Sequence, residues 1–303
     1  MDVVVISRNI QVSVIIQNYD GSNMDELLES LVNQTTDNLE IICLTDDSSK
    51  FKPNDYSIVK EFADFKISDV NGDYVIFANP SNKYYLVGIE SLLEYSSAND
   101  LELLLFSHIN YDINTKEIYE KSNDALREVS KNINWTIFSV NDFSTYLFSL
   151  KFDMTNIFYK KTFLDNYLAD DSFSSPLNNI YLFFKSILNS DKIGIFKNSI
   201  YIKKDQSRYK IDKLNLENEY YYDIENSTLE EINKLIDDIK KLFKKSNQYE
   251  LYKDNLDNLK RDLYGQFSYD DSLKSDFSND GSPDSNGLKL FNPIFRLKKI
   301  FRK

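Results

Sequence analysis

The stretch VSVIIQNYDGSNMDELLESLVNQTTDNLEIICLTDDSS, residues 12–49, decides the fold of this 303-residue chain. It opens on a run of β-branched residues at 12–16, which predicts a short buried strand. Apolar residues then recur at intervals of three and four over 24–32, which predicts an amphipathic helix. A second apolar run at 39–44 predicts another buried strand. Strand, helix and strand in this order form a βαβ unit, so the two strands are predicted to be parallel.

Polar side chains follow both predicted strands. Asn18 and Asp20 come after the first strand, and Asp46 and Asp47 come after the second. In open α/β sheets, ligands bind beyond the carboxyl ends of the strands. The sequence therefore predicts a nucleotide-type site formed by these four residues.

Further along the chain, the pattern keeps alternating between strand and helix. Apolar runs at 74–77 and 101–106 predict strands, helical spacing spans 84–95, and the stretch 58–65 predicts a short helix or strand. This alternation is typical of a layered α/β sheet. Beyond residue 205, Ser227 and Glu230 have the spacing of a capping box, and two helices are predicted with a polar break at 246–248. We expect these helices to dock on the domain.

Composition and charge restrict the classes of function. The net charge of −12 argues against nucleic-acid binding by the globular part. The single cysteine, Cys43, lies inside a predicted strand, so we expect no disulfide framework and a cytoplasmic compartment. We also expect neither a secretory signal nor a membrane-spanning segment. The single histidine, His108, ends a predicted strand, and a structural role is favoured over a place at a site mouth. The pair Lys203–Lys204 has two interpretations, contact with phosphate or ordinary solvated lysines, and the second is the default.

The segment 289–303, KLFNPIFRLKKIFRK, carries six basic side chains and no acidic ones. Helical spacing gives it an apolar face and a basic face, which predicts a helix that binds an anionic membrane surface. A nucleic-acid patch and a partner-docking helix are the alternatives, and the many large apolar residues favour the membrane. The predicted membrane residues are Leu290, Ile294, Arg296, Leu297, Lys299, Phe301 and Arg302.

Several segments also match one family in the family's order. VSVIIQNYD, LLESLVNQTTDNLEIIC, LTDDSS, NGDYVIF and TNIFYKKTFLDN resemble VSVIIPVYN, LxSLxNQTxxxxEII, V(N/D)DGS, GEYIxF and NKLYKKSFLxxN of the glycosyltransferase family 2 proteins. The resemblance covers about residues 11–205. It implies a GT-A nucleotide-sugar-binding fold, that is, a Rossmann-like, mostly parallel sheet flanked by helices, here with a C-terminal helical extension. The predicted organisation is a GT-A domain at 1–210, a helical extension at 211–267, a flexible acidic Ser/Asp linker at 268–288 and the basic helix at 289–303.

The family transfers a sugar from a nucleotide-diphosphate donor to an acceptor hydroxyl. Its Asp-x-Asp motif holds Mg²⁺ or Mn²⁺ on the donor diphosphate, and a carboxylate serves as the base for the acceptor. The resemblance implies that Asp46 contacts the nucleotide. At the metal motif, however, this chain has Asn79, Ser81 and Asn82, and at the base motif it has Asn178 and Asn179. An amide has no useful basicity near neutral pH. The family's Ala-Arg-Asn-x-Gly element before the strand at 74–77 is also absent.

Two hypotheses follow for function. The first is a family-2-like glycosyltransferase that adds sugar to an envelope glycan or lipid-linked acceptor, in which case Mg²⁺ or Mn²⁺ is the expected cofactor. The second is a catalytically inactive pseudo-glycosyltransferase, a binding or scaffold subunit for a protein partner at the membrane. Both place the chain in the cytoplasm, peripheral on the inner face of the cell membrane.

Overall fold

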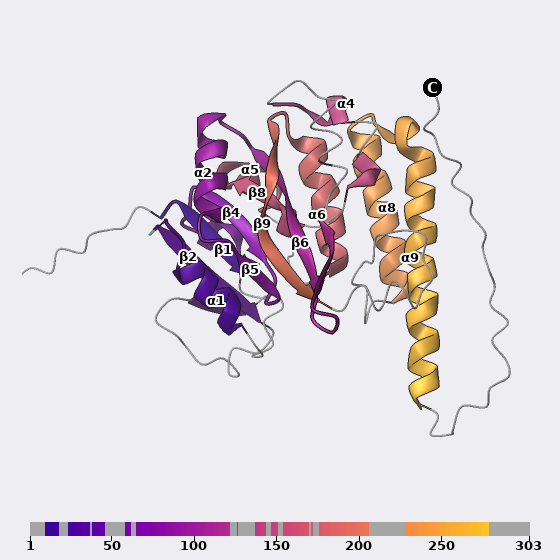
Figure 1. The fold of residues 1–303 in the computed structure, drawn as a ribbon. Coiled ribbons are helices and arrows are strands. Elements are labelled where there is room, and N and C mark those ends of the chain that lie inside the picture. The colour runs from indigo at the N-terminus through magenta and orange to yellow at the C-terminus, as the bar shows by residue number, and fades with distance from the viewer. Residues whose placement is uncertain are drawn as a thin grey trace, which may run out of the picture.

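The computed structural model describes residues 10–17, 24–36, 38–45, 58–61, 65–121, 126, 137–143, 147–150, 154–169, 171, 176–205 and 228–278. Figure 1 shows the fold, a twisted sheet with helices on both sides. The strands are β1 (Val12–Ile16), β2 (Leu39–Thr45), β3 (Ile58–Glu61), β4 (Tyr74–Ala78), β5 (Asn82–Tyr84), β6 (Leu103–Asp112), β7 (Glu117–Lys121), β8 (Ile157–Lys160) and β9 (Ile193–Asp205). The helices are α1 (Asp25–Val32), α2 (Gly88–Ala98), α4 (Val140–Phe143), α5 (Lys161–Tyr167), α6 (Pro176–Asn189), α8 (Leu229–Lys245) and α9 (Tyr249–Ser278), with 3₁₀ turns at Ile67–Asp69, Leu147–Ser149 and Met154–Asn156.

The predicted βαβ unit is confirmed. β1 pairs in parallel with β2 on one side and with β4 on the other, and all five of its residues are buried. Buried on both faces, β1 has the near-continuous apolar sequence that is typical of a central parallel strand. The stretch predicted as a short helix or strand contains β3, which extends the sheet in parallel beyond β2.

The strand order is β3-β2-β1-β4-β8-β6-β9-β5, with β7 paired to β6. Within the described strands, β8 runs antiparallel to both β4 and β6, while β6 and β9 are parallel. β5 lies at the far edge, antiparallel to β9. Most strands therefore share one direction, so the sheet is mostly parallel, as predicted, and their carboxyl ends meet at one edge.

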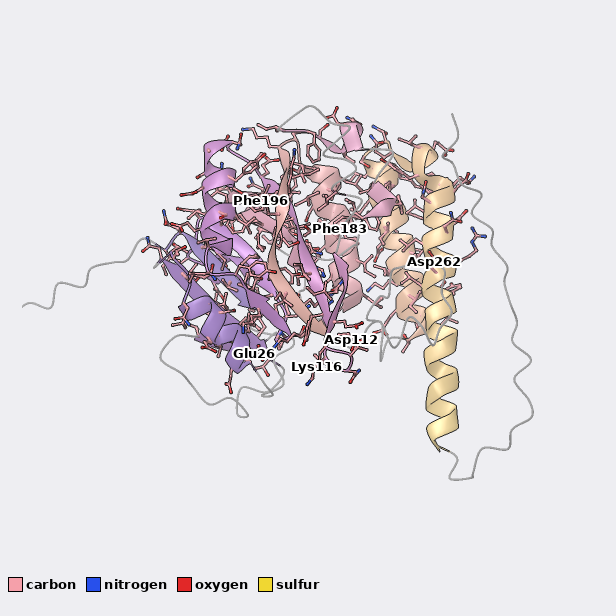
Figure 2. The ribbon with its side chains drawn as sticks, in the orientation of Figure 1. Glu26, Asp112, Lys116, Phe183, Phe196 and Asp262 are labelled. Atoms are coloured by element: carbon pink, nitrogen blue, oxygen red, sulfur yellow. The ribbon has the colours of Figure 1, made fainter. Side chains whose placement is uncertain are left out.

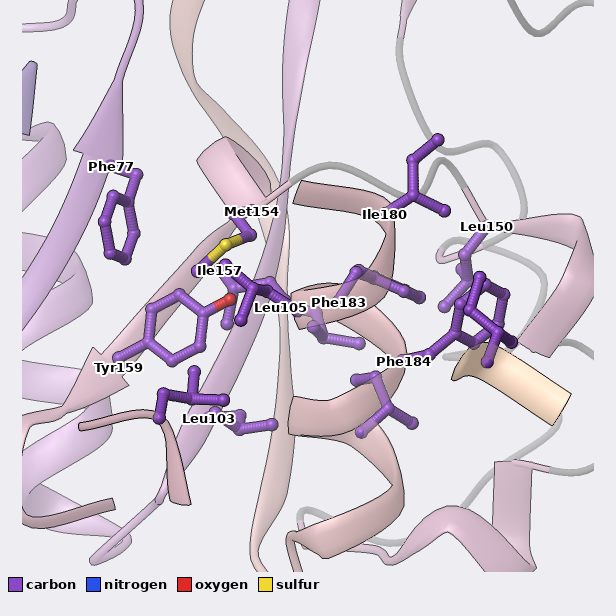
Figure 3. Close-up of a cluster of buried hydrophobic side chains, with 14 of the residues drawn as sticks. Phe77, Leu103, Leu105, Leu150, Met154, Ile157, Tyr159, Ile180, Phe183 and Phe184 are labelled. Carbon is purple, nitrogen blue, oxygen red and sulfur yellow. The ribbon is translucent and has the colours of Figure 1, made fainter. Parts of the chain in front are cut away.

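Alternating side chains of the sheet form two cores. On one face, Val14 and Ile16 of β1 pack with Leu27 of α1 and Ile89 of α2. On the other face, the strands share a core with α6, α8 and α9, and Figure 3 shows Phe77, Leu103 and Tyr159 of the sheet beside Phe183 of α6. The next residue of α6, Phe184, contacts Phe148 and also Phe243 of α8, so α6 connects the core of the sheet to the C-terminal helices.

A close approach fixes the turn before β4. A Cβ atom added to Gly72 would lie 2.6 Å from the backbone nitrogen of Ser13. The Gly72 N–H donates to Ser13 Oγ (2.9 Å), which in turn donates to the buried carboxylate of Glu40 (2.6 Å). The turn and β1 are therefore in contact at backbone distance, and only glycine fits at position 72 without movement.

The two C-terminal helices pack on the domain, as expected. α8 ends at Lys245 and α9 begins at Tyr249, so the predicted break at 246–248 is confirmed. Phe243 of α8 and Tyr252 of α9 meet Phe148 and Phe184 in an aromatic cluster. Burial in this cluster raises the pKa of Tyr252 to about 12.

Two details of this region differ from the sequence prediction. The capping box is formed by Thr228 and Glu231, one residue later than the predicted pair Ser227 and Glu230. Each of the two pairs consists of a Ser or Thr followed three residues later by a Glu, so the sequence pattern alone does not select between them. In addition, α9 continues to Ser278, into the stretch predicted as a flexible linker from 268. Tyr269, Leu273 and Phe277 recur at intervals of four, a helical pattern that a composition rich in Ser and Asp obscures.

The described part of the chain contains no helix that is both long enough and apolar enough to cross a membrane. The predicted basic helix at 289–303, and with it the predicted membrane residues, lies outside the described residues.

Candidate functional site

The carboxyl edge of the parallel strands is the candidate site, and Gln17 lies at its centre. Gln17 directly follows β1 and is buried. Its backbone N–H donates to the carbonyl of Ala78, the last residue of β4, at 2.9 Å. The parallel pairing of β1 and β4 thus continues one residue past the end of β1. It brings the loop that starts at Asn79 next to the end of β1.

The side chain of Gln17 reaches the first turns of α6. Its Nε2 donates to Oδ1 of Asn179 (3.3 Å), and Nδ2 of Asn179 donates to Oε1 of Gln17 (3.4 Å). This reciprocal amide contact joins residues that are 162 positions apart in the chain. It brings the predicted base position to the same edge as the predicted metal motif. Asn178, the other predicted base position, precedes it on α6 and is half-buried.

The predicted base position has no proton-accepting chemistry in this chain. A neutral amide neither takes a proton near pH 7 nor carries charge. The nearest described carboxylate before α6 in sequence is Asp171, which is held in an ion pair with Lys185 at 2.7 Å. Asp171 therefore has a structural partner on α6.

The predicted metal-motif positions form a tight turn between β4 and β5. The N–H of Asn82 donates to the carbonyl of Asn79 (3.0 Å) across Pro80 and Ser81. Asn82 then begins β5 and is 1% exposed. Neither its Oδ1 nor its Nδ2 has a hydrogen-bond partner among the described residues. Burying an amide group without a hydrogen-bond partner costs roughly 1–3 kcal/mol of folding free energy. We therefore infer that this side chain bonds to a water molecule or to a ligand group.

These positions do not fit a divalent cation. Mg²⁺ and Mn²⁺ on a diphosphate are held through carboxylates, which supply charge as well as oxygen atoms. Asn79, Ser81 and Asn82 offer only neutral oxygens. Within the described residues, no group of three or more histidine, cysteine, aspartate or glutamate side chains is arranged to hold a metal ion.

Positive charge instead borders the turn. Lys204 of β9 donates its backbone N–H to the carbonyl of Ser81 (3.1 Å), so β9 runs directly beside the turn. The Lys204 ammonium contacts the carboxylate of Glu26 on α1, and Lys83 of β5 reaches the same carboxylate at 3.5 Å. Lys204, joined by Lys83, holds the pKa of Glu26 below its usual value. Figure 2 shows Glu26 at the same lower end of the molecule as Asp112, the last residue of β6.

A polar network that was not predicted from the sequence lies next to the group formed by Glu26, Lys83 and Lys204. His108 is buried, and its two ring nitrogens contact Oδ1 of Asn156 (2.8 Å) and Oδ1 of Asn110 (2.9 Å). The imidazole stacks on Tyr201, whose hydroxyl donates to Asn156 at 2.8 Å. The available signal was the strict alternation of His108, Asn110 and Asp112 with apolar residues, which indicates a strand with one polar face.

The histidine therefore has the structural role that the sequence favoured. The predicted donor-binding residues Asn18, Asp20, Asp46 and Asp47 lie outside the described residues, so their role stays a prediction.

No protein-family model matches the sequence, and no curated protein matches it. Among solved structures, residues 1–349 of S. aureus TarS in complex with UDP-GlcNAc match with a TM-score of 0.50 and 14% identity. That match covers 75% of this chain and 66% of the TarS chain. A second crystal structure of S. aureus TarS 1–349 matches at a TM-score of 0.48 and 14% identity, over 86% of this chain and 92% of the TarS chain.

At this level of identity, the likeness shows a shared fold. The chain has the α/β architecture of the GT-A fold, which is the fold that the sequence resemblance implied.

Proposed function

We propose that this chain binds a nucleoside-diphosphate sugar at the carboxyl edge of its parallel strands. The observation that carries the proposal is the position of Gln17, which joins the end of β4 through Ala78 and the start of α6 through Asn179. In open α/β sheets this edge is where ligands bind. The GT-A fold of the chain and the UDP-GlcNAc in the TarS structure support the choice of ligand class.

We further propose that the chain acts as a binding or scaffold subunit, without metal-assisted transfer. Transfer requires a base for the acceptor hydroxyl and charge on the leaving diphosphate. The corresponding positions carry amides and a hydroxyl: Asn79, Ser81, Asn82, Asn178 and Asn179. Asn179 is moreover engaged with Gln17 in a contact that only neutral amides form in both directions.

Sugar transfer to an envelope glycan or lipid-linked acceptor is the competing proposal. The observation in its favour is the segment 289–303, whose pattern predicts a helix on an anionic membrane surface. Such a helix would hold the site beside a lipid-linked acceptor, on the inner face of the cell membrane. In that case Mg²⁺ or Mn²⁺ would be the cofactor and family 2 the family.

Calorimetric titration tests donor binding. UDP, GDP, UDP-GlcNAc and further UDP- and GDP-sugars are titrated into the full chain, once with Mn²⁺ and once with EDTA. Micromolar binding of at least one nucleotide sugar is expected. Absence of binding in every titration would overturn the proposal.

A turnover assay separates the two candidate functions. The full chain is incubated with the nucleotide sugar that binds and with a membrane lipid extract, and release of the nucleoside diphosphate is followed. We expect no release above the uncatalysed rate. Release that disappears when Asp46 is changed to asparagine would establish transfer and overturn the scaffold proposal.

The membrane segment is tested separately. Removing residues 289–303 is expected to abolish co-sedimentation with vesicles that contain anionic lipid. A truncated chain that still co-sediments would contradict this anchor. The shortened protein keeps every residue that the structure describes, so its nucleotide binding should be unchanged.

A further inference from the structure

The turn at Asn79–Asn82 does not fit a divalent cation, yet a bound diphosphate must be neutralised. We propose that Lys203 of β9 binds the diphosphate directly and takes the place of the metal ion. The inference rests on the proposed function, because it concerns the same nucleotide site. It predicts that donor binding is independent of divalent cations.

The first step is the register of three strands. Lys203 of β9 is the Cα partner of Asn82 on β5 and of Asn110 on β6. Residues paired across neighbouring strands place their side chains on the same face, with Cβ atoms about 5 Å apart. Lys203 therefore lies between two amide side chains, directly beside the turn that replaces the metal motif. It is half-buried, and it forms no ion pair with any described carboxylate.

The second step is the shared carboxylate. Lys83 and Lys204 both contact Glu26, so two ammonium groups share one negative charge. The carboxylate of Asp112, at the end of β6, accepts the backbone N–H groups of Asn114 (2.7 Å) and Thr115 (3.0 Å) and serves the β6–β7 turn. Lys83 and Lys204 alternate with Asn82 and Lys203 along β5 and β9, so they lie on the opposite face of these strands, whereas Lys203 shares the face of Asn82.

The third step is the unpaired amide of Asn82. A polar side chain that is almost fully buried and lacks partners among the described residues indicates a missing ligand group or water. Its Nδ2 lies on the face that carries Lys203 and provides a hydrogen-bond donor of the kind that phosphate oxygens accept. Ammonium and amide donors together bind an anion, whereas an ammonium group repels a cation. The residues at this turn therefore select a diphosphate over a metal ion.

The test measures UDP and GDP binding in EDTA and in Mn²⁺ at constant ionic strength. We expect the two conditions to agree within twofold for the unaltered chain. Lys203→Gln should weaken UDP binding at least tenfold in EDTA, and Lys203→Arg should restore it to within about threefold. Lys204→Gln should weaken it less, because Glu26 already neutralises part of that charge.

Lys197→Gln is the matched control. Lys197 is an exposed lysine of the same strand, six positions and therefore roughly 20 Å before Lys203. Its replacement should leave UDP binding within twofold. Thermal unfolding of each variant, followed by circular dichroism, establishes that the replaced residue is not simply needed for folding.

The outcomes distinguish the inference from the function on which it rests. UDP binding that requires Mn²⁺ would overturn the inference and leave the proposed nucleotide site intact. The same holds if binding in EDTA survives Lys203→Gln unchanged. If no nucleotide binds to the unaltered chain in either condition, the proposed function itself is wrong, and the inference fails with it.

Discussion

Gln17 and Asn179 form a reciprocal pair of amide hydrogen bonds, at 3.3 and 3.4 Å, between the end of β1 and the first turns of α6. The pair is partly buried, and it fixes how α6 approaches the carboxyl edge of the sheet. A carboxylate at position 179 would keep the bond from Gln17 but would offer no donor in return. The contact therefore belongs to a site with neutral groups, consistent with the other amides at this edge.

A double-mutant cycle measures the strength of this pair. Gln17→Ala and Asn179→Ala are each expected to lower the free energy of unfolding by about 1–2 kcal/mol, with a coupling of about 1 kcal/mol because both changes remove the same contact. Denaturant unfolding of the four proteins provides the data. Asn189→Ala is the control partner, since it lies roughly 15 Å along α6 and bonds locally to the carbonyl of Lys185. A Gln17–Asn179 coupling no larger than the Gln17–Asn189 value would mean that the amide pair contributes no stability.

The approach of the Gly72 turn to β1 gives a second prediction. Gly72→Ala should destabilise the protein by about 3 kcal/mol, because the new Cβ would meet the backbone of Ser13 and Val12 at 2.6–2.8 Å. Gly194→Ala is the comparison: its nearest neighbour, at 2.5 Å, is the end of the Leu101 side chain, which can rotate away. We expect a loss of about 1 kcal/mol there. Equal losses in denaturant unfolding would show that the Gly72 turn can move.

The parts of the fold that follow from local pattern could be predicted from the sequence. The β-branched run at 12–16 and the apolar run at 39–44 predicted β1 and β2, because a strand buried on both faces needs apolar residues at every position. Apolar residues at intervals of three and four predicted α8 and α9, and the interruption of this pattern predicted the break between them. The pattern exists because these apolar residues face the domain core.

The candidate site was predictable only in part, because its contacts join distant parts of the chain. The turn after β4 and the first turn of α6 were predicted as site positions, but nothing local pairs Gln17 with Asn179 across 162 residues. Lys203 meets Asn82 and Asn110 only because β9 lies between β5 and β6, and strand order is not encoded in any one segment. The same reason explains why the contacts of His108 with Asn156 and Tyr201 were missed.

Acid stability gives a third prediction, at Asp100. This residue has a positive φ of 49°, and its carboxylate contacts Lys160 at 2.5 Å and also Lys192. The two ammonium groups, Lys160 first, lower the pKa of Asp100 to about 2. A lowered pKa in the folded state means that the ion pairs stabilise the protein above about pH 4, and that this contribution is lost as the pH falls toward 2.

Asp100→Asn isolates the charge, because asparagine also tolerates positive φ. The variant should be less stable than the unaltered chain at pH 6, and the difference should vanish by about pH 2. Denaturant unfolding across this range provides the measurement. A difference that stays constant with pH would show that the carboxylate contributes through its shape or hydrogen bonds and not through its charge.

Alkaline stability gives the last prediction, at Tyr252. Its ring lies in the aromatic cluster with Phe148 and Phe243, and its hydroxyl has no hydrogen-bond partner among the described residues. Burial raises its pKa to about 12, so the folded state holds the proton more tightly than the unfolded state. Stability should therefore be unaffected by this group below about pH 10 and should fall as the pH rises from about 10 toward 12.

Tyr252→Phe keeps the ring and removes the unpaired hydroxyl, so it should be neutral or stabilising by about 1 kcal/mol at pH 7. It should also lose less stability than the unaltered chain between pH 10 and 12, when both are unfolded by denaturant. A variant that is destabilised at pH 7 by more than 1 kcal/mol would mean that the hydroxyl is hydrogen-bonded in solution, and that the contact between α8 and α9 includes a polar group at its centre.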